Sequence, residues 1–387
     1  MTGSRYNKDR SRAFIPSRAG RASFSKEGAQ VYDIAVVGAG PAGSTFARLV
    51  GQRYKVLLID KRIFSDPQHS HAPGKCCGGL LAPDAQRMLS SLGLGLPKSV
   101  LEEPQLFVVR AIDIPRGIER YYQRHYINIH RQKFDRWLVR MVPEQVDTRL
   151  GYRLHACERE KGGFRLTLSR GGDVRTETAR VLVGADGASS KVRRHFLSER
   201  PPPRTYIAIQ EWVEAEHAMP YFSSLFDPEV TDFYCWTIPK DRCLIVGAAL
   251  DPRANSVEKF RQLKRRLEDY GFRMGKILWR EGAYILRPVK TGQVSTGCEG
   301  VALIGEAGGW ISPSSAEGLS YAFRSAMLLA DALRESLHGF EKRYLEGSRG
   351  LRRNLFIKGL KSRFIFNPVL RSLVMRSGLQ AIDLYLS

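Results

Sequence analysis

Two adjacent cysteines, Cys76 and Cys77, are the most reactive pair of neighbouring side chains in this 387-residue sequence. They lie in the segment PGKCCGGLLAP and are followed by the glycine pair Gly78 and Gly79. Neighbouring cysteines bridge each other only with strain, and six cysteines in a chain of this length do not form a disulfide framework. Paired glycines let main-chain N–H groups approach a ring or a substrate, and a thiol can donate a proton. The segment therefore predicts a surface that contacts a bound molecule.

A metal site is the alternative use of these thiols, because His69 and His71 lie shortly before them. Tetrahedral metal sites usually combine two separated pairs of ligands at regular spacing. The sequence has no CxxC pair and no second cluster of cysteine and histidine. We therefore expect no bound metal, and free thiols favour a reducing cytoplasm as the compartment.

A nucleotide-binding pattern begins at the apolar run YDIAVV, which predicts a buried strand. The run leads into Gly38, Gly40 and Gly43, which permit a tight turn, the approach of a pyrophosphate and close packing of helix on strand, in that order. A helix follows, and a second strand ends at Asp60, whose carboxylate can accept both ribose hydroxyls of an adenosine. This βαβ unit predicts a bound dinucleotide.

Two later segments favour a flavin over a nicotinamide dinucleotide. RVLVGADGASSKVR is an apolar strand that ends at a GADG motif containing Asp186. The segment from 300 to 333 predicts a strand, a loop and a long helix that begins near Gly318. No second dinucleotide fingerprint is present, so we expect the electron donor, NAD(P)H or a reduced carrier protein, to bind transiently.

These motifs together resemble the FAD-dependent oxidoreductases related to p-hydroxybenzoate hydroxylase. The family's GD motif is Gly305-Glu306 here, Ala316 replaces a later glycine, and HRQKFD matches its Arg-x-x-Phe-Asp segment. The resemblance implies a Rossmann-like α/β FAD-binding domain of the glutathione-reductase type. It also implies that Glu306 accepts a hydrogen bond from the ribityl chain and that Arg131 lies on the FAD side. The expected cofactor-binding residues are Gly38, Gly40, Ala42, Gly43, Asp60, Lys61, Arg131, Asp186, Gly305, Glu306, Gly318 and Leu319.

Within this group the chain is similar to geranylgeranyl reductases. Residues 75–79 resemble their K-P-C-G-G segment, residues 233–240 (FYCWTIPK) their Y-x-W-x-F-P-K strand, and residues 315–319 (SAEGL) their S-G-E-G-I segment. The resemblance implies that reduced flavin delivers hydride to a carbon-carbon double bond of an isoprenoid or similar lipid-like substrate. The residues expected at the catalytic face are Cys77, Gly78, Gly79 and Trp236.

Two other flavin chemistries remain open at this point. An aromatic monooxygenase shares the same FAD motifs. Flavin halogenases carry a W-x-W-x-I-P stretch that the run YCWTIP resembles. Those halogenases need a catalytic lysine within their own motif, and Lys75 does not lie in such a motif.

The expected organisation is a discontinuous FAD-binding domain with an inserted antiparallel-sheet substrate domain and a C-terminal helical segment. Short alternations of apolar and polar residues between 201 and 290 predict the inserted sheet. The expected units are a flexible basic arm (1–30), the FAD-binding domain (31–200 and 291–345), the substrate domain (201–290) and a basic amphipathic tail (346–387). Aromatic residues that could line an apolar tunnel in the substrate domain are Trp212, Tyr221, Phe222, Phe226, Phe233, Tyr234 and Trp236.

The formal net charge of +22 predicts attraction to polyanions, which include nucleic acid, anionic lipid and a phosphorylated substrate. The tail mixes Arg and Lys with Leu, Phe and Ile, so it suits either an anionic membrane surface or packing of an apolar face on the domain. No apolar run is long enough for a membrane span. We expect an enzyme of the cytoplasm, with the membrane periphery as an alternative, a small apolar substrate and no nucleic acid partner. The arm is also compatible with a targeting peptide.

Overall fold

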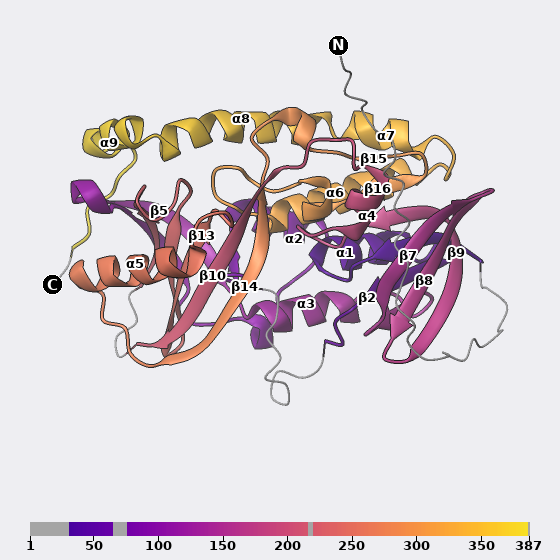
Figure 1. Cartoon of the computed structure of the whole chain (residues 1–387), viewed down its shortest axis with the longest axis horizontal. Coiled ribbons are helices and arrows are strands. Elements are labelled where there is room, and N and C mark those ends of the chain that lie inside the picture. Colours follow the sequence, from indigo (N-terminus) through magenta and orange to yellow (C-terminus); the bar gives the residue numbers. More distant parts are fainter. Residues whose placement is uncertain (1–30, 65–75, 216–219, 386–387) are drawn as a thin grey trace, which may run out of the picture.

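The computed structural model describes residues 31–64, 76–215 and 220–385. They form two β-sheets with helices packed against them (Figure 1). The first sheet has the strand order β15-β16-β9-β1-β2-β6, and β8 and β7 extend it from β9. Its strands are β1 (Val31–Val37), β2 (Val56–Asp60), β6 (Asp147–Leu150), β7 (Arg153–Glu160), β8 (Gly163–Arg170), β9 (Asp173–Gly184), β15 (Gly297–Cys298) and β16 (Val301–Leu303).

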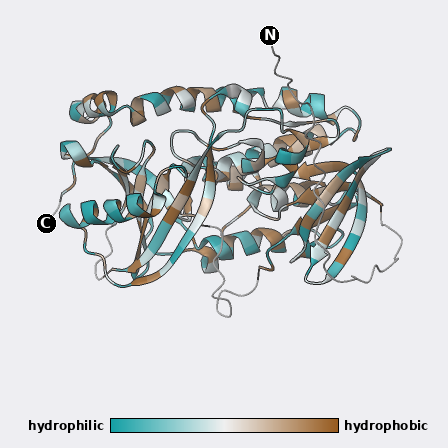
Figure 2. Ribbon diagram, in the orientation of Figure 1, coloured by the Kyte–Doolittle hydropathy of each residue, from teal (hydrophilic) through white to brown (hydrophobic). Residues whose placement is uncertain are grey.

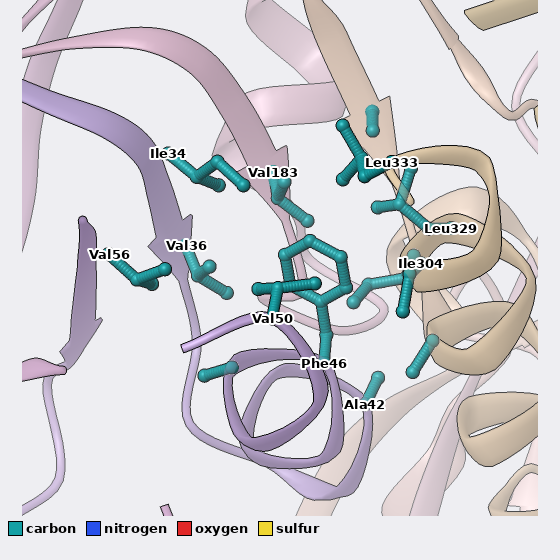
Figure 3. Close-up of a cluster of buried hydrophobic side chains, with 14 of the residues drawn as sticks. Ile34, Val36, Ala42, Phe46, Val50, Val56, Val183, Ile304, Leu329 and Leu333 are labelled. Atoms are coloured by element: carbon teal, nitrogen blue, oxygen red, sulfur yellow. The ribbon is translucent and has the colours of Figure 1, made fainter. Parts of the chain in front are cut away.

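The centre of the first sheet is parallel, since β1 pairs with β2 on one side and with β9 on the other. Both faces are covered, which explains why β1 and β2 read as continuous apolar runs. One face packs on α1 (Pro41–Val50) and α6 (Leu319–Ala332), where fully buried Phe46 fills the space between sheet and helix (Figure 3). The other face packs on the β7-β8-β9 extension. The predicted βαβ unit is confirmed.

The second sheet has the order β14-β10-β13-β12-β11-β4-β5-β3. Its pairs from β14 to β11 are antiparallel, whereas β11 and β4 are parallel. Helix α5 covers one face through Phe260, Leu263 and Leu267. Its strands are β3 (Leu80–Leu81), β4 (Leu106–Asp113), β5 (Ile118–Asn128), β10 (Arg204–Glu214), β11 (Tyr221–Phe226), β12 (Cys235–Lys240), β13 (Cys243–Leu250) and β14 (Ile277–Arg287).

The second sheet is therefore larger than the inserted antiparallel sheet expected from residues 201–290. It also contains β3, β4 and β5, which come from a segment grouped by sequence with the FAD-binding domain. Alternation of apolar and polar residues identifies a strand but does not specify its partner, because pairing depends on contacts between distant segments.

The C-terminal tail forms two helices that run along one edge of the molecule, α8 and α9 (Figure 1). They separate at Asn367, whose side chain accepts hydrogen bonds from the main-chain nitrogens of Val369 and Leu370, both at 3.0 Å. In the described part of the chain, no helix has the length and apolar content to cross a membrane. The helices of the fold are α1, α2 (Pro83–Ser91), α3 (Arg131–Arg140), α4 (Lys191–Phe196), α5 (Ser256–Asp269), α6, α7 (Phe340–Gly347), α8 (Arg349–Phe366) and α9 (Pro368–Ser377).

Candidate active site

A cavity of about 820 Å³ lies between the two sheets, within the size range of ligand and cofactor sites. Its walls come from the turn after β1, the end of β2, the loop before β3, strand β12 and the start of α6. Gly43 lies outside the lining. The predicted site residues that line the cavity are Gly38, Gly40, Ala42, Asp60, Lys61, Cys77, Gly78, Gly79, Arg131, Asp186, Trp236, Gly305, Glu306, Gly318 and Leu319.

The glycine turn between β1 and α1 is shaped by two close backbone approaches. Gly38 has φ of +109°, and a Cβ there would lie 2.4 Å from the main-chain oxygen of Ala185. A Cβ on Gly43 would lie 1.8 Å from the oxygen of Gly38, so this glycine brings helix and strand together. A Cβ on Gly40 would meet only the guanidinium of Arg62, at 3.7 Å. The chain itself requires Gly38 and Gly43, whereas Gly40 leaves space beside the first turn of α1.

Asp60 at the end of β2 is the first member of a chain of alternating charges. Its carboxylate accepts a hydrogen bond from the main-chain nitrogen of Ala39 at 2.7 Å and forms an ion pair with Arg62 at 2.9 Å. Arg62 also pairs with Asp135 at 2.9 Å, and Asp135 pairs with Arg131 at 2.7 Å. The pKa of Asp135 is lowered, because Arg131 and Arg62 together outweigh the opposing effect of its burial. This chain links the glycine turn to the thiol loop.

Asp186 in the GADG motif provides an unsatisfied acceptor at the cavity. One carboxylate oxygen accepts a hydrogen bond from the main-chain nitrogen of Lys191, at 2.6 Å, at the start of α4. The other oxygen is buried and has no partner within the described structure. Burial raises the pKa of this carboxyl group. Buried polar atoms are nearly always paired, so the unpaired oxygen fits a hydroxyl or N–H donor of a bound ligand.

Glu306 replaces the aspartate of the family's GD motif, and its longer side chain extends beyond the turn that contains it. Its Oε1 atom accepts a hydrogen bond from the main-chain nitrogen of Leu286 on β14 at 2.9 Å. The extra methylene thus ties the turn to the second sheet. Gly305 before it has φ of +56°, and a Cβ there would lie 2.9 Å from the Cβ of Ala42. The predicted bond from the ribityl chain to Glu306 stays a prediction.

Helix α6 begins at Leu319 after Gly318, as the sequence predicts, and its N-terminus faces the cavity. Glu317 accepts hydrogen bonds from the nitrogen of Ser320 at 2.7 Å and from its hydroxyl at 2.5 Å. Burial raises the pKa of Glu317. Ala316 has φ of +51°, the left-handed conformation that favours the glycine found there in the related family.

The two cysteines of the loop point to different surroundings, and all six cysteines of the chain are free of disulfides. Cys76 is buried in the core of the second sheet, with its sulfur 3.9 Å from the oxygen of Ala208. Cys77 lines the cavity beside Arg131. The pKa of Arg131 is raised, because Asp135 and Cys77 beside its guanidinium outweigh the opposing effect of burial. Cys76 also borders the cavity, but it is only 9% exposed and its sulfur lies against Ala208, so Cys77 is the better placed of the two to act there.

Among the described residues, no group of three His, Cys, Asp or Glu side chains is placed to hold an ion. His69, His71 and Lys75 lie outside the described residues.

Lys240, the last residue of β12, is a buried lysine that contacts the thiol loop, and it is not among the site residues predicted from the sequence. Its ammonium donates hydrogen bonds to the main-chain oxygens of Gly79 at 3.2 Å and Ile129 at 2.8 Å, and to the side chain of Asn128. Burial lowers the pKa of Lys240 to about 7, against the opposing charges of Glu102 and Cys77. Lys240 is the last residue of the run FYCWTIPK, and this position was the signal in the sequence that could have identified it.

The aromatic wall of the cavity is made by a different set of residues from the tunnel expected from the sequence. Trp236 is packed so closely on β13 that a Cβ on Gly247 would lie 2.3 Å from its ring. Trp212 instead stacks on Trp279 with ring centroids 4.5 Å apart. Of the seven aromatic residues proposed, Phe222, Phe226, Tyr234 and Trp236 line the cavity, whereas Trp212, Tyr221 and Phe233 do not. Tyr284 of β14 also lines the cavity, and so do Tyr126 of β5 and Phe366 of α8, which come from segments outside the expected substrate domain.

The parallel sheet, the glycine turn with its open space at Gly40, and the unpaired oxygen of Asp186 define a dinucleotide-binding α/β protein with an attached substrate site. The chain belongs to the FAD binding domain family, whose model matches residues 31–269. It is thus a member of a family of FAD-dependent oxidoreductases, and its cofactor is FAD.

Among curated proteins, the chain is similar to Protein CbrA of Shigella sonnei (strain Ss046), with 39% identity over 354 residues. This match covers 91% of the chain and 98% of the relative. Protein CbrA of Escherichia coli (strain K12) is 38% identical over 351 residues, with 91% and 98% coverage.

Solved structures share the fold at lower identity. A geranylgeranyl bacteriochlorophyll reductase-like protein from Thermoplasma acidophilum has a TM-score of 0.77 and 20% identity, covering 90% of this chain and 91% of its own. PqsL, a probable FAD-dependent monooxygenase from Pseudomonas aeruginosa, has a TM-score of 0.66 and 18% identity, covering 90% and 100%. The flavin-dependent halogenase CmlS has a TM-score of 0.66 and 17% identity, covering 85% and 63%.

Proposed function

We propose that this FAD-dependent oxidoreductase reduces carbon-carbon double bonds of an apolar, lipid-like substrate such as an isoprenoid chain, as geranylgeranyl reductases do. The observation that carries the proposal is the continuity of one cavity. It extends from the glycine turn past Cys77 and the glycine pair to the aromatic wall of the second sheet. A single cavity can hold a dinucleotide at one end and an apolar chain at the other.

The substrate end of the cavity suits an apolar chain. Its wall includes Ile238, Phe222, Tyr234, Trp236 and Phe366. Aromatic and aliphatic side chains stabilise a hydrocarbon by removing its surface from water, and they offer few hydrogen bonds to a strongly polar substrate. Double bonds in such a chain would lie against the loop at Gly78 and Gly79.

The loop from Cys77 to Gly79 is fixed in place from below. A Cβ on Gly78 would lie 2.3 Å from the Cδ1 atom of Ile238, and a Cβ on Gly79 would lie 2.3 Å from the oxygen of Ile129. A side chain is therefore excluded at Gly79, where φ is +63°, whereas a side chain at Gly78 would require the end of the Ile238 side chain to move. The loop as it stands presents its backbone and the Cys77 thiol. We assign Gly78 and Gly79 to shaping the reactive face, and Trp236 to confining the substrate there.

The chemistry that bound FAD would supply, once reduced, is a hydride for one carbon of the double bond. The second carbon needs a proton, and we assign its donation to the Cys77 thiol, which lines the cavity. The guanidinium of Arg131 beside Cys77 balances the negative charge that remains on the sulfur, and solvent returns the proton afterwards. The apolar wall excludes water while the proton is transferred.

The binding of the cofactor is proposed to follow the glutathione-reductase type. Asp60 would receive the adenosine ribose, the space beside Gly40 the pyrophosphate, and Glu306 the ribityl chain. The positive end of α6 at Gly318 and Leu319 would stabilise negative charge on the reduced flavin. The electron donor, NAD(P)H or a reduced carrier protein, would bind only transiently.

The test is anaerobic turnover of the purified yellow protein. Chemically reduced enzyme is mixed with a lipid that carries a geranylgeranyl chain, and products are analysed by mass spectrometry. We expect a gain of about two mass units for each double bond reduced, the sum of a hydride and a proton. Cys77→Ala should slow turnover and leave FAD occupancy unchanged, whereas Cys243→Ala, outside the cavity, should leave both unchanged.

The competing chemistry has its own result in the same experiment. A hydroxylase would consume oxygen with a phenolic substrate and would leave the lipid unchanged under anaerobic conditions. That outcome would overturn the reductase proposal while leaving FAD binding intact.

A further inference from the structure

The outer face of α8 carries an exposed apolar stripe. The buried face of this helix contains Leu351, Leu355 and Ser362. Large apolar side chains lie on the opposite face, at spacings that keep them together on a helix. Their exposed fractions are 54% for Phe356, 53% for Ile357, 41% for Leu360 and 54% for Phe364. Val289 joins the stripe, because it borders the same small surface hollow as Phe356 and Leu360.

Helix α9 continues this surface, and its buried face contains a charged residue, Arg371, beside Met375. Arg371 is only 6% exposed and pairs at 3.0 Å with Asp113, which is fully buried. On the opposite face, Val369 and Leu373 are each 60% exposed, and Val374 is 45% exposed. A helix on a water-exposed surface normally turns its apolar residues inward, so this arrangement indicates an apolar environment outside.

The two helices also carry charge of one sign. Residues 349–377 include no aspartate or glutamate. Figure 2 shows hydrophobic residues interspersed with hydrophilic ones along α8 and α9. The basic residues in this range are Arg349, Arg352, Arg353, Lys358, Lys361, Arg363, Arg371 and Arg376.

We propose that the outer face of α8 and α9 docks on an anionic lipid bilayer, with the apolar stripe in the headgroup boundary and the flanking Arg and Lys side chains on the lipid phosphates. Interfacial helices of peripheral proteins combine these same two features. A second copy of the chain fits less well, because a two-fold interface would place the same patch against itself. That would bring one set of cations against another with no acidic residue on either helix to neutralise them.

Docking in this way has a consequence for the cavity. Lys358 and Phe366 belong to α8 and line the cavity, so this helix connects the docking surface to the active site. A chain that leaves the bilayer would reach the aromatic wall beneath α8. This consequence rests on the proposed function, whereas the docking itself does not.

The experiment is sedimentation of the full-length FAD-loaded protein with vesicles. One set contains phosphatidylcholine alone, and a second contains phosphatidylglycerol as well. We expect binding to the anionic set that weakens with added salt, and little binding to the neutral set. The double variant Phe364→Glu with Leu373→Glu should bind roughly tenfold or more weakly, because two exposed apolar side chains of the docking face are lost and negative charge is added. Val257→Glu on α5, where the native side chain is 48% exposed, is the matched control and should bind like the wild type.

Two other outcomes would count against the docking proposal. Flavin absorbance checks that every variant is folded and loaded. Equal binding by the double variant and the control would show that another basic segment carries the attraction. A concentration-dependent dimer that the double variant abolishes, without vesicle binding, would assign the same face to a second copy of the chain. A failure of lipid reduction with intact vesicle binding would refute the proposed function and leave the docking surface standing.

Discussion

The buried ammonium of Lys240 lies 3.2 Å from the main-chain oxygen of Gly79 and holds the loop that presents Cys77 to the cavity. Strand β12 thus contributes Trp236 to the wall and Lys240 to the support of the loop. The substrate-facing loop is consequently positioned by the second sheet.

Replacing this lysine should destabilise the fold. Lys240→Met removes the donor to Gly79, Ile129 and Asn128, and buried acceptors without a donor cost about 1–3 kcal/mol. We expect a loss of this size in the free energy of unfolding by urea, together with faster labelling of Cys77 by a thiol reagent. Lys342→Met on the exposed surface of α7 should change stability by less than about 0.5 kcal/mol. Equal losses in the two variants would contradict the role assigned to Lys240.

Stability should also depend on pH through Lys240. Burial lowers its pKa from 10.5 to about 7 in the folded protein. Between these values the unfolded chain binds a proton that the folded chain lacks, so this group makes the free energy of unfolding rise with pH. Below pH 7 both states are protonated and the dependence ends. Urea unfolding of wild type and Lys240→Met across this window should show the wild-type value rising relative to the variant, and parallel curves would refute the shift.

Gly40 and Gly43 should respond differently to the same substitution. Gly43→Ala places a Cβ 1.8 Å from the oxygen of Gly38, so both stability and FAD binding should fall. Gly40→Ala meets only a flexible side chain at 3.7 Å, so the apoprotein should lose at most about 1 kcal/mol. Its methyl group would enter the space assigned to the pyrophosphate, and FAD affinity should fall about tenfold or more. Fluorescence titration with FAD measures affinity, and unchanged affinity in Gly40→Ala would place the pyrophosphate elsewhere.

Ala316 should be a position where glycine is tolerated or preferred. Its φ of +51° costs an alanine about 1–2 kcal/mol, whereas glycine adopts this conformation freely. After the greater flexibility of glycine in the unfolded chain is subtracted, Ala316→Gly should raise the free energy of unfolding by up to about 1 kcal/mol. Ala316→Val, a β-branched residue, should lower it. Thermal melts of the FAD-loaded proteins measure both, and the reverse order would exclude backbone strain here.

The buried ion pair between Arg371 and Asp113 should contribute far more to the free energy of unfolding than an exposed ion pair does. Among the described residues, Arg371→Met leaves Arg116, at 3.7 Å, as the remaining ion-pair partner of the fully buried Asp113 carboxylate. Breaking a buried pair in this way costs about 3–5 kcal/mol. Arg253 pairs with Asp251 at 2.7 Å but is 81% exposed, so Arg253→Met should change the free energy of unfolding far less. Similar losses in urea unfolding would show that α9 is not anchored by this pair.

The sequence by itself determined the cofactor half of the protein. The spacing of Gly38, Gly40 and Gly43 between two apolar runs specifies a βαβ unit, because each glycine answers a local steric need. The start of α6 after Gly318 and the break at Asn367 were also predictable from the sequence. Helix caps and proline act on the residues next to them, so these features depend on local sequence alone.

Only the tertiary structure decided the substrate half. The partners of β4 and β5, the ion pairs from Asp60 to Arg131, the burial of Lys240 and the outward apolar face of α8 and α9 depend on contacts between segments far apart in the chain. Residue type and local spacing set what an element can be. The free energy of packing one element against another decides which face it buries.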